Sequence, residues 1–163
     1  MHQDITDLMP ALRRFAYSLT GSMPDADDLL QNTIERLLSR DRPDDVDLMK
    51  WAFRVCRNIW IDDCRAKKIR RDAAENPELS EGQVINGEHH IAQQLELNRV
   101  DKAMAALPQD QRQIISLVAI QGMPYKGVAE TLGVPVGTVM SRLARARAAL
   151  SEALTQDNVG TEL

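Results

Sequence analysis

Apolar residues near the N-terminus repeat at the spacing of an α-helix. In "ITDLMPALRRFAYSLTG" the repeating apolar positions are Leu8, Leu12, Phe15 and Leu19. Gly21 suits the C-terminus of this helix because glycine adopts the left-handed conformation without strain. A second helix is predicted after Ser22, whose hydroxyl can cap it, and Pro24 fits its first turn. The apolar set of this second helix is Leu29, Leu30, Ile34, Leu37 and Leu38.

A third, longer helix is predicted from about residue 47 to residue 72. The segment "DRPDDVD" before it contains proline and acids without a helical apolar pattern, so we expect a loop there. The apolar stripe of the third helix consists of Leu48, Ala52, Val55, Cys56, Ile59 and Trp60. Because three amphipathic helices with short connections can bury a common core, residues 1–72 are predicted to form one small helical domain.

The helical pattern fades over residues 73–98 and then returns. The segment "ENPELSEGQVINGEHH" contains proline, glycine and acids but no apolar period, which predicts a flexible acidic linker. Residues 99–154 resume the helical pattern, whereas residues 155–163 are predicted to be a disordered tail. The sequence therefore predicts an all-α protein with two small helical domains joined by a flexible linker.

The second predicted domain contains the pattern of a helix-turn-helix motif. Its first helix would bury Val128, Ala129 and Leu132, and its second Val139, Leu143, Ala146 and Leu150. Gly133 lies between them and can take the left-handed conformation of a tight turn. Another side of the second helix carries Thr138, Ser141, Arg142 and Arg145. Hydroxyl and guanidinium groups in this order suit base edges and phosphates in a major groove, so we predict a DNA-reading helix. A solvated basic face on a bundle helix is the alternative.

The distribution of charge supports contact with nucleic acid, although the formal net charge is −4. Lysines and arginines concentrate in the third predicted helix and in the second helix of the helix-turn-helix, and the predicted linker has none. In the third helix, aromatic residues alternate with cations, which suits the bases and phosphates of single-stranded DNA. Trp51 and Phe53 fit a helical core as well. Asn58 and Asp62 fit a structural or a DNA-binding role equally.

Other classes of function find little support in the sequence. We see no glycine-rich phosphate loop, paired catalytic carboxylates or nucleophile–base set, so we expect no enzyme, cofactor or small-molecule substrate. Cys56, Cys64, His89 and His90 lack the spacing of a zinc site, so no metal is expected. No apolar run reaches the ~18–20 residues that span a bilayer, and the N-terminus lacks a signal-peptide pattern. We therefore expect a cytoplasmic protein with reduced thiols and no membrane insertion.

These segments resemble those of the extracytoplasmic-function (ECF) sigma factors, small two-domain members of the sigma-70 family. "DADDLLQNTIERLL" is similar to the family's core-polymerase-binding helix, and "WAFRVCRNIWIDDCRAKKIRR" to its promoter-melting and −10-reading segment. "LPQDQRQIISLVAIQGMPYKGVAETLGVPVGTVMSRLARARAAL" is similar to its −35-reading domain almost throughout. The resemblance covers roughly residues 8–72 and 100–153. It implies sigma region 2 at 1–72 and sigma region 4 at 99–154.

The resemblance also implies a function and its residues. An alternative sigma factor binds the β and β′ subunits of core RNA polymerase, directs promoter-specific initiation, and is commonly held inactive by an anti-sigma factor. The implied polymerase-binding residues are Asp25, Asp27, Asp28, Leu29, Gln31 and Asn32. The implied −10 DNA-binding residues are Trp51, Arg54, Arg57, Asn58, Trp60, Asp62, Arg65, Lys67 and Lys68. The implied −35 DNA-binding residues are Thr138, Ser141, Arg142 and Arg145.

Two positions depart from the family's usual pattern. Gly127 stands where the family usually has an acid, and Met140 where it usually has a lysine. A glycine inside a helix lowers its stability, and the loss of a cation weakens contact with phosphates. These departures leave open a sigma mimic that sequesters an anti-sigma factor without binding promoters. A stand-alone helix-turn-helix repressor is a further alternative. For a sigma factor, isolated basic faces on an acidic body predict poor binding to free DNA until polymerase places both on one promoter.

Overall fold

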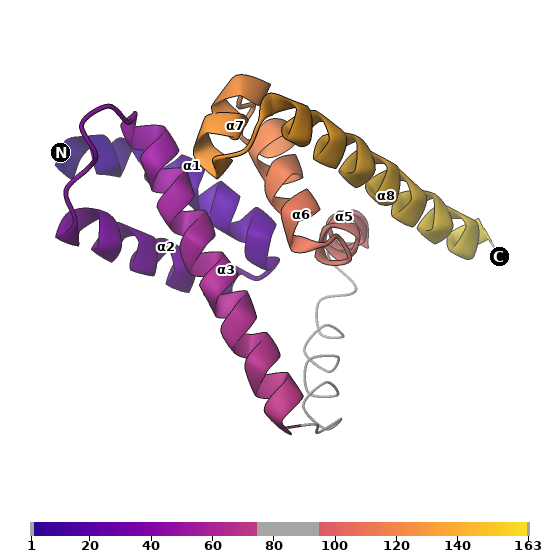
Figure 1. Cartoon of the computed structure of the whole chain (residues 1–163). Coiled ribbons are helices and arrows are strands. Elements are labelled where there is room, and N and C mark those ends of the chain that lie inside the picture. The colour runs from indigo at the N-terminus through magenta and orange to yellow at the C-terminus, as the bar shows by residue number, and fades with distance from the viewer. Residues whose placement is uncertain (1, 75–94, 163) are drawn as a thin grey trace.

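The computed structural model describes residues 2–74 and 95–162, which form helices joined by short loops (Figure 1). The N-terminal helices are α1 (His2–Thr20), α2 (Met23–Ser39) and α3 (Leu48–Ala74). The C-terminal helices are α5 (Leu95–Ala105), α6 (Gln109–Ile115), the π-helix η1 (Ser116–Ile120), α7 (Tyr125–Leu132) and α8 (Val136–Glu162). The described part of the chain has no strand, which confirms the predicted all-α class.

The junction between α1 and α2 forms as its sequence predicts. Gly21 adopts a φ of +73° and its N–H donates to the carbonyl oxygen of Tyr17 at 2.7 Å, which ends α1. Ser22 caps α2 by accepting a hydrogen bond from the N–H of Asp25 at 3.5 Å. Leu37 of α2 is fully buried, whereas Leu38 is 47% exposed. The prediction of Leu38 as a core residue is therefore wrong, because neighbouring residues on a helix point about 100° apart.

Helix α3 crosses α1 and α2 and supplies most of the aromatic core. The rings of Phe15 and Phe53 meet edge to face, with centroids 5.0 Å apart and an interplanar angle of 86°. Both side chains are almost fully buried, and the predicted stripe from Ala52 to Trp60 is buried beside them. Beyond Cys64, α3 projects away from the other helices as an exposed rod (Figure 1). The N-terminal core thus holds the first half of α3 and leaves the second half free.

The C-terminal helices contain the predicted helix-turn-helix. Gly133 adopts a φ of +69° between α7 and α8, and its N–H donates to the carbonyl oxygen of Ala129 at 2.9 Å. Val128 of α7 is fully buried against the apolar stripe of α8, where Val139, Leu143 and Ala146 are buried. The motif and its core stripe are therefore confirmed. The sequence pattern did not predict that the helix before it continues as a π-helix.

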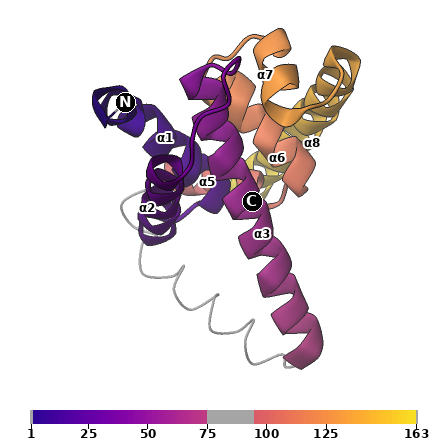
Figure 2. The same ribbon diagram turned by 60° about the vertical axis from the view of Figure 1, so that its left-hand side comes forward.

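The two groups of helices pack against each other. Helix α3 contacts α7, and α1 contacts both α5 and η1, as the two views of the ribbon show (Figures 1 and 2). Residues buried in both halves form one continuous apolar cluster. The sequence predicted two domains but gave no sign that they would be in contact. This contact decides how the predicted DNA-binding residues are presented.

The helices extend past three of the predicted domain boundaries. Helix α3 continues to Ala74 and α5 begins at Leu95, so both enter the predicted linker at 73–98. The rest of that linker lies outside the described residues. Helix α8 continues to Glu162, in contrast to the disordered tail predicted at 155–163. No proline interrupts α8, and its hydrogen-bonded backbone propagates through residues that lack a strong apolar period.

Candidate nucleic-acid interface

The basic side of α8 is presented as its sequence predicts. Thr138 and Arg142 are partly exposed, and Ser141 and Arg145 are exposed. Arg142 lies 3.8 Å from a carboxylate oxygen of Asp110, measured from its Nε. This pair is partly exposed and weak, so the guanidinium can exchange the carboxylate for a phosphate or a base edge. The structure therefore brings the four predicted −35 residues together on the surface of α8.

Close packing around position 127 explains why a glycine fits there. Gly127 is buried on α7, and a Cβ atom at this position would lie only 3.0 Å from the Cγ of Met123. A larger side chain here would require the Met123 side chain to shift by a few tenths of an ångström. The departure from the family's pattern is therefore accommodated by close packing inside the domain and does not alter the exposed side of α8. Met140, the other departure, is 53% exposed.

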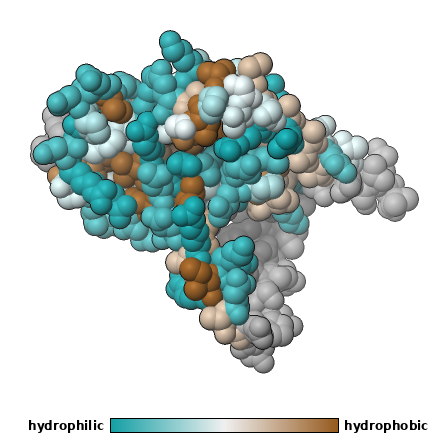
Figure 3. Space-filling view, in the orientation of Figure 1, coloured by the Kyte–Doolittle hydropathy of each residue, from teal (hydrophilic) through white to brown (hydrophobic). Residues whose placement is uncertain are grey.

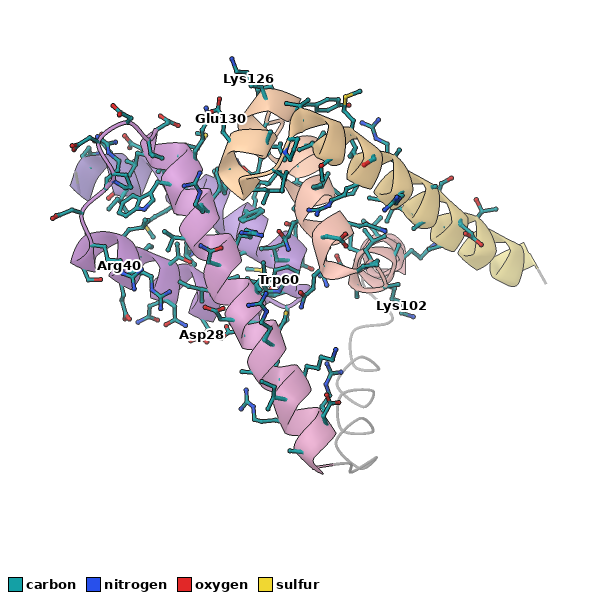
Figure 4. All side chains as sticks on the ribbon, in the orientation of Figure 1. Asp28, Arg40, Trp60, Lys102, Lys126 and Glu130 are labelled. Atoms are coloured by element: carbon teal, nitrogen blue, oxygen red, sulfur yellow. The ribbon has the colours of Figure 1, made fainter. Side chains whose placement is uncertain are left out.

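The two tryptophans predicted to contact −10 DNA are core residues in this arrangement. Trp51 and Trp60 are each 6% exposed and belong to the apolar cluster. Figure 4 shows Trp60 beside the crossing of α3 with the helices behind it. Neither ring is available to stack on a base here, and Phe53 is buried as well. The aromatic residues between the cations therefore serve the core, because they lie on the inner side of α3.

The projecting half of α3 keeps its cations in solvent. Arg65, Lys67 and Lys68 are exposed, and so are Asn58 and Asp62 in the part of α3 that precedes Cys64. The space-filling view shows this end of α3 as largely hydrophilic (Figure 3). Ile69, in this half of α3, is 68% exposed. A rod with cations on its surface presents an accessible track for a phosphate backbone.

The first half of α3 uses its cations differently. Arg54 donates from Nε to the carbonyl oxygen of Thr131 at 3.1 Å and from Nη2 to that of Glu130 at 2.6 Å. These oxygens lie in the last turn of α7, where carbonyls lack helical partners and cations are favoured. The ammonium of Lys50 also contacts the Glu130 carboxylate, which lies on the side of α7 that faces α3 (Figure 4). Two basic residues of α3 thus hold the first helix of the helix-turn-helix.

Arg57 completes this contact and brings like charges together. Its Nε donates to Oε1 of the buried Gln113 at 2.8 Å, and its Nη1 donates to the side chain of Asn58 at 2.9 Å. Burial lowers the pKa of Arg57, and the charges of Arg142, Arg54 and Arg65 lower it further. Cations from α3 and α8, predicted to contact different parts of a promoter, are therefore neighbours in this arrangement.

The acidic face of α2 is exposed apart from one residue. Asp25, Asp27, Asp28, Gln31 and Asn32 are exposed, and Figure 4 marks Asp28 on this helix. Leu29 is 3% exposed and lies in the apolar core. Its predicted contact with polymerase does not fit this arrangement, because its side chain points inward. Arg13 of α1 lies 3.7 Å from Asp27 in an exposed pair, and the other acids of this face form no ion pair with the described residues.

The two thiols differ in their surroundings. Cys56 is buried, and burial raises its pKa to about 12. Cys64 is half-buried, and burial raises its pKa as well, opposed by Lys67, by a hydrogen bond with Gln109 and by Arg112.

The described residues contain no cluster of His, Cys, Asp and Glu that could hold a metal ion. His89 and His90 lie outside them. None of the described helices is long and apolar enough to cross a membrane.

Comparison with known proteins accounts for this combination of features. The family model for Sigma-70 region 2 matches residues 5–70, and that for Sigma-70, region 4 matches residues 97–150. The chain is 35% identical over 159 residues to the ECF RNA polymerase sigma factor EcfG of Rhodopseudomonas palustris (strain TIE-1), covering 96% of this chain and 86% of that one. It is 31% identical over 162 residues to the RNA polymerase sigma factor CnrH of Cupriavidus metallidurans, covering 91% and 83%.

Solved structures of two sigma factors are similar to this chain over most of its length. The sigma factor RpoE in complex with the anti-sigma factor NepR, from Bartonella quintana, is 28% identical with a TM-score of 0.76, covering 94% of this chain and 96% of that one. CnrH in complex with the cytosolic domain of CnrY is 30% identical with a TM-score of 0.70, covering 96% and 88%. Sequence, fold and the position of the helix-turn-helix lead to one assignment. The chain belongs to the ECF sigma factors of the sigma-70 family.

Proposed function

We propose that this sigma factor directs promoter-specific initiation in the cytoplasm, with α8 on the −35 duplex and α3 on the −10 strand. The observation that carries this division is the outward side of α8, where Thr138, Ser141, Arg142 and Arg145 lie together on a helix held by a buried stripe. A recognition helix presents its residues to a major groove in this way. Its role is to bind and position, and the chemistry of RNA synthesis belongs to polymerase.

We call the arrangement in which α3 packs against α7 closed. In the closed arrangement the protein cannot bind the −35 and −10 elements at the same time. Their names place them about 25 base pairs apart, which is about 85 Å of duplex at 3.4 Å per base pair. Helices α3 and α7 are in direct contact here, so they must separate before α3 and α8 reach both elements. Residues 75–94 connect the two parts, and a chain of about 20 residues can extend to at most about 70 Å. Together with the lengths of α3 and α5, which these residues join, this reach is enough for the two domains to occupy both elements.

Core polymerase provides the means of separation. We infer that the exposed acids of α2, including Asp25, Asp27 and Asp28, dock on a basic surface of the β′ subunit, and that the C-terminal domain contacts the β subunit. Complementary charge speeds association and fixes orientation. Binding at two distant places on polymerase then holds the domains apart. Arg54 and Arg57 become free to join Arg65, Lys67 and Lys68 on the −10 strand.

An anti-sigma partner fits a groove that both domains form. The groove has a volume of about 720 Å³ and lies between α1, α5 and η1. Its exposed apolar residues are Met23, Val100 and Ile120, which are 50%, 46% and 42% exposed. Arg13, Arg14 and Arg112 also line it. Apolar walls beside arginines suit a helix with one apolar side and flanking carboxylates.

A charge inside this groove is expected to prevent such a helix from binding. The probe is a synthetic amphipathic peptide of about 18 residues, long enough to form a helix, with leucines on one side and glutamates beside them. Val100→Glu should weaken its binding at least about tenfold, since it places a carboxylate against apolar and acidic groups. Fluorescence anisotropy measures the affinity. Met49→Glu is the matched control, because Met49 is 43% exposed and lies outside the groove. Equal loss in both variants would contradict the assignment.

Run-off transcription with core polymerase tests the promoter function. Arg142→Ala should reduce transcription from the cognate promoter about 5- to 150-fold, because one guanidinium contact with a base or phosphate contributes about 1–3 kcal/mol. The fold should be unaffected, since its partly exposed pair with Asp110 contributes little. Arg147→Ala is the control, because Arg147 is exposed on another side of α8. Full activity of Arg142→Ala would remove α8 as the reader. Inactive wild-type protein would favour a sigma mimic.

A further inference from the structure

We propose that Met140 and Ala144 of α8 read the C5-methyl group of a thymine in the −35 element. Both residues are exposed, Met140 at 53%, and their four-residue spacing places them in one row along the helix. We call these two residues the apolar row. The contact rests on the proposed placement of α8 on the −35 duplex. It adds a determinant of sequence preference beside the four polar residues proposed to bind that duplex.

The apolar row lies beside polar residues that are proposed to enter the same groove. Ser141 and Arg145 are also four positions apart and form an adjacent exposed row, turned from the apolar row by about 100°. The buried stripe of α8 lies on another side, where Val139 is fully enclosed. A major groove about 12 Å wide admits an α-helix, so its base edges meet both exposed rows. A helix that presents Ser141 to a base edge therefore brings Met140 into the groove with it.

The chemistry of the apolar row selects one group in the major groove. Base pairs present hydrogen-bond donors and acceptors there, and the apolar group among them is the C5-methyl of thymine. The thioether of Met140 is a weak acceptor with no donor, and the methyl group of Ala144 can neither donate nor accept. A base amine or carbonyl covered by these side chains would lose its hydrogen bond to water, whereas a methyl group gains from the contact. The apolar row therefore favours a base pair that contains thymine.

Gly137 leaves space for a base pair at the start of this row. It is the second residue of α8 and lies three positions before Met140, so the two are neighbours on the helix surface. Among the described residues, a Cβ atom at position 137 would meet nothing within 4 Å apart from its chain neighbours and the backbone of its own helix. The φ of Gly137 is not in the left-handed region either. Neither packing nor a turn requires glycine here, so its role is to let DNA approach the backbone closely.

Methionine at this position exchanges a contact with phosphate for a contact with a base. The family usually has a lysine where Met140 stands, and an ammonium binds phosphates whatever the sequence. Each phosphate that a protein neutralises on duplex DNA contributes about 0.9 to the slope of log affinity against log salt. Met140 neutralises none, so the protein should bind its −35 element with a shallower salt dependence and a stronger preference for thymine than a variant with lysine.

The test removes single methyl groups from the DNA. Mapping the transcription starts that appear on overexpression of the protein supplies a cognate promoter, which is bound by the full-length protein with core polymerase. Each thymine of the −35 element, on either strand, is replaced in turn by deoxyuridine, which lacks only the C5-methyl group. At one or two of these positions we expect binding in a competition gel shift to weaken about three- to fivefold, the loss that corresponds to one buried methyl group.

Variants at position 140 identify the side chain that meets the methyl group. Met140→Leu keeps an apolar side chain and should retain the sensitivity to deoxyuridine, whereas Met140→Gln has a similar length but a polar end and should lose most of it. Met140→Lys should lose it too and should steepen the salt slope by about 0.9. Met49→Gln is the matched control, because Met49 is 43% exposed at the start of α3 and should leave the sensitivity as in the wild type.

Two results would overturn the proposal. One is a −35 element in which no replacement of thymine by deoxyuridine weakens binding, and the other is a Met140→Gln variant that keeps the full sensitivity. Arg142→Ala on the same probe separates this contact from the proposed function. If Arg142→Ala loses affinity while deoxyuridine has no effect, α8 reads the element without its apolar row, and the methyl contact alone is wrong. If neither change alters binding, α8 does not read the element, and both assignments are wrong.

Discussion

Phe53→Ala is expected to lower the free energy of unfolding by about 3–5 kcal/mol, a large part of the about 5–15 kcal/mol that stabilises a typical domain. Phe53 is 1% exposed, and its ring meets that of Phe15 edge to face at 5.0 Å. Removing the ring loses its burial, opens a cavity between α1 and α3, and breaks the aromatic pair. Urea unfolding followed by circular dichroism measures the change.

The matched variant is Phe53→Leu, which keeps most of the apolar volume. Its cost should fall to about 1–2 kcal/mol, because the cavity is smaller and only the edge-to-face geometry is lost. Equal unfolding curves for Phe53→Ala and the wild type would show that this ring is not central to the core. The same outcome would reopen the possibility that the aromatic residues of α3 act on DNA.

Asp28→Arg is expected to impair assembly with core polymerase at least about 100-fold, because a like charge facing a basic docking surface costs several kcal/mol. Asp28 is exposed on α2 and has no cation partner among the described residues, so the free protein should unfold as the wild type does. Assembly is measured by native gel shift with core polymerase. Glu152→Arg carries the same change of charge on α8 and should assemble normally. Normal assembly of Asp28→Arg would remove α2 as the docking helix.

Local features of the fold were predictable because each has a local physical cause. Gly21 and Gly133 end helices through a left-handed conformation that glycine adopts freely, and Ser22 caps α2 through a hydroxyl near free N–H groups. The stripe of Val139, Leu143 and Ala146 has the helical period that a buried side requires. These signals depend on residues a few positions apart, so the sequence displays them.

Contacts between distant residues were not predictable in the same way. Arg54 and Arg57 were expected to bind DNA, and nothing in their spacing distinguishes a phosphate partner from a carbonyl oxygen of α7. Trp60 was expected to contact DNA, but an amphipathic helix with aromatic residues on its inner side has the same composition as one that stacks on bases. The prediction that Leu29 contacts polymerase is wrong for a related reason. Its polar neighbours in the sequence lie on the outer side of α2, whereas Leu29 itself lies on the inner side.

The half-buried thiol of Cys64 makes the boundary between the domains accessible to chemistry. It sits on α3 beside Gln109 and Arg112 of region 4, whereas the thiol of Cys56 is enclosed and has a pKa of about 12. Burial raises the pKa of both thiols, but only Cys64 is partly open to solvent, so an alkylating reagent reaches Cys64 more readily than the enclosed Cys56. Cys64 lies where the two domains meet, so the rate at which it is modified would report how often the domains separate.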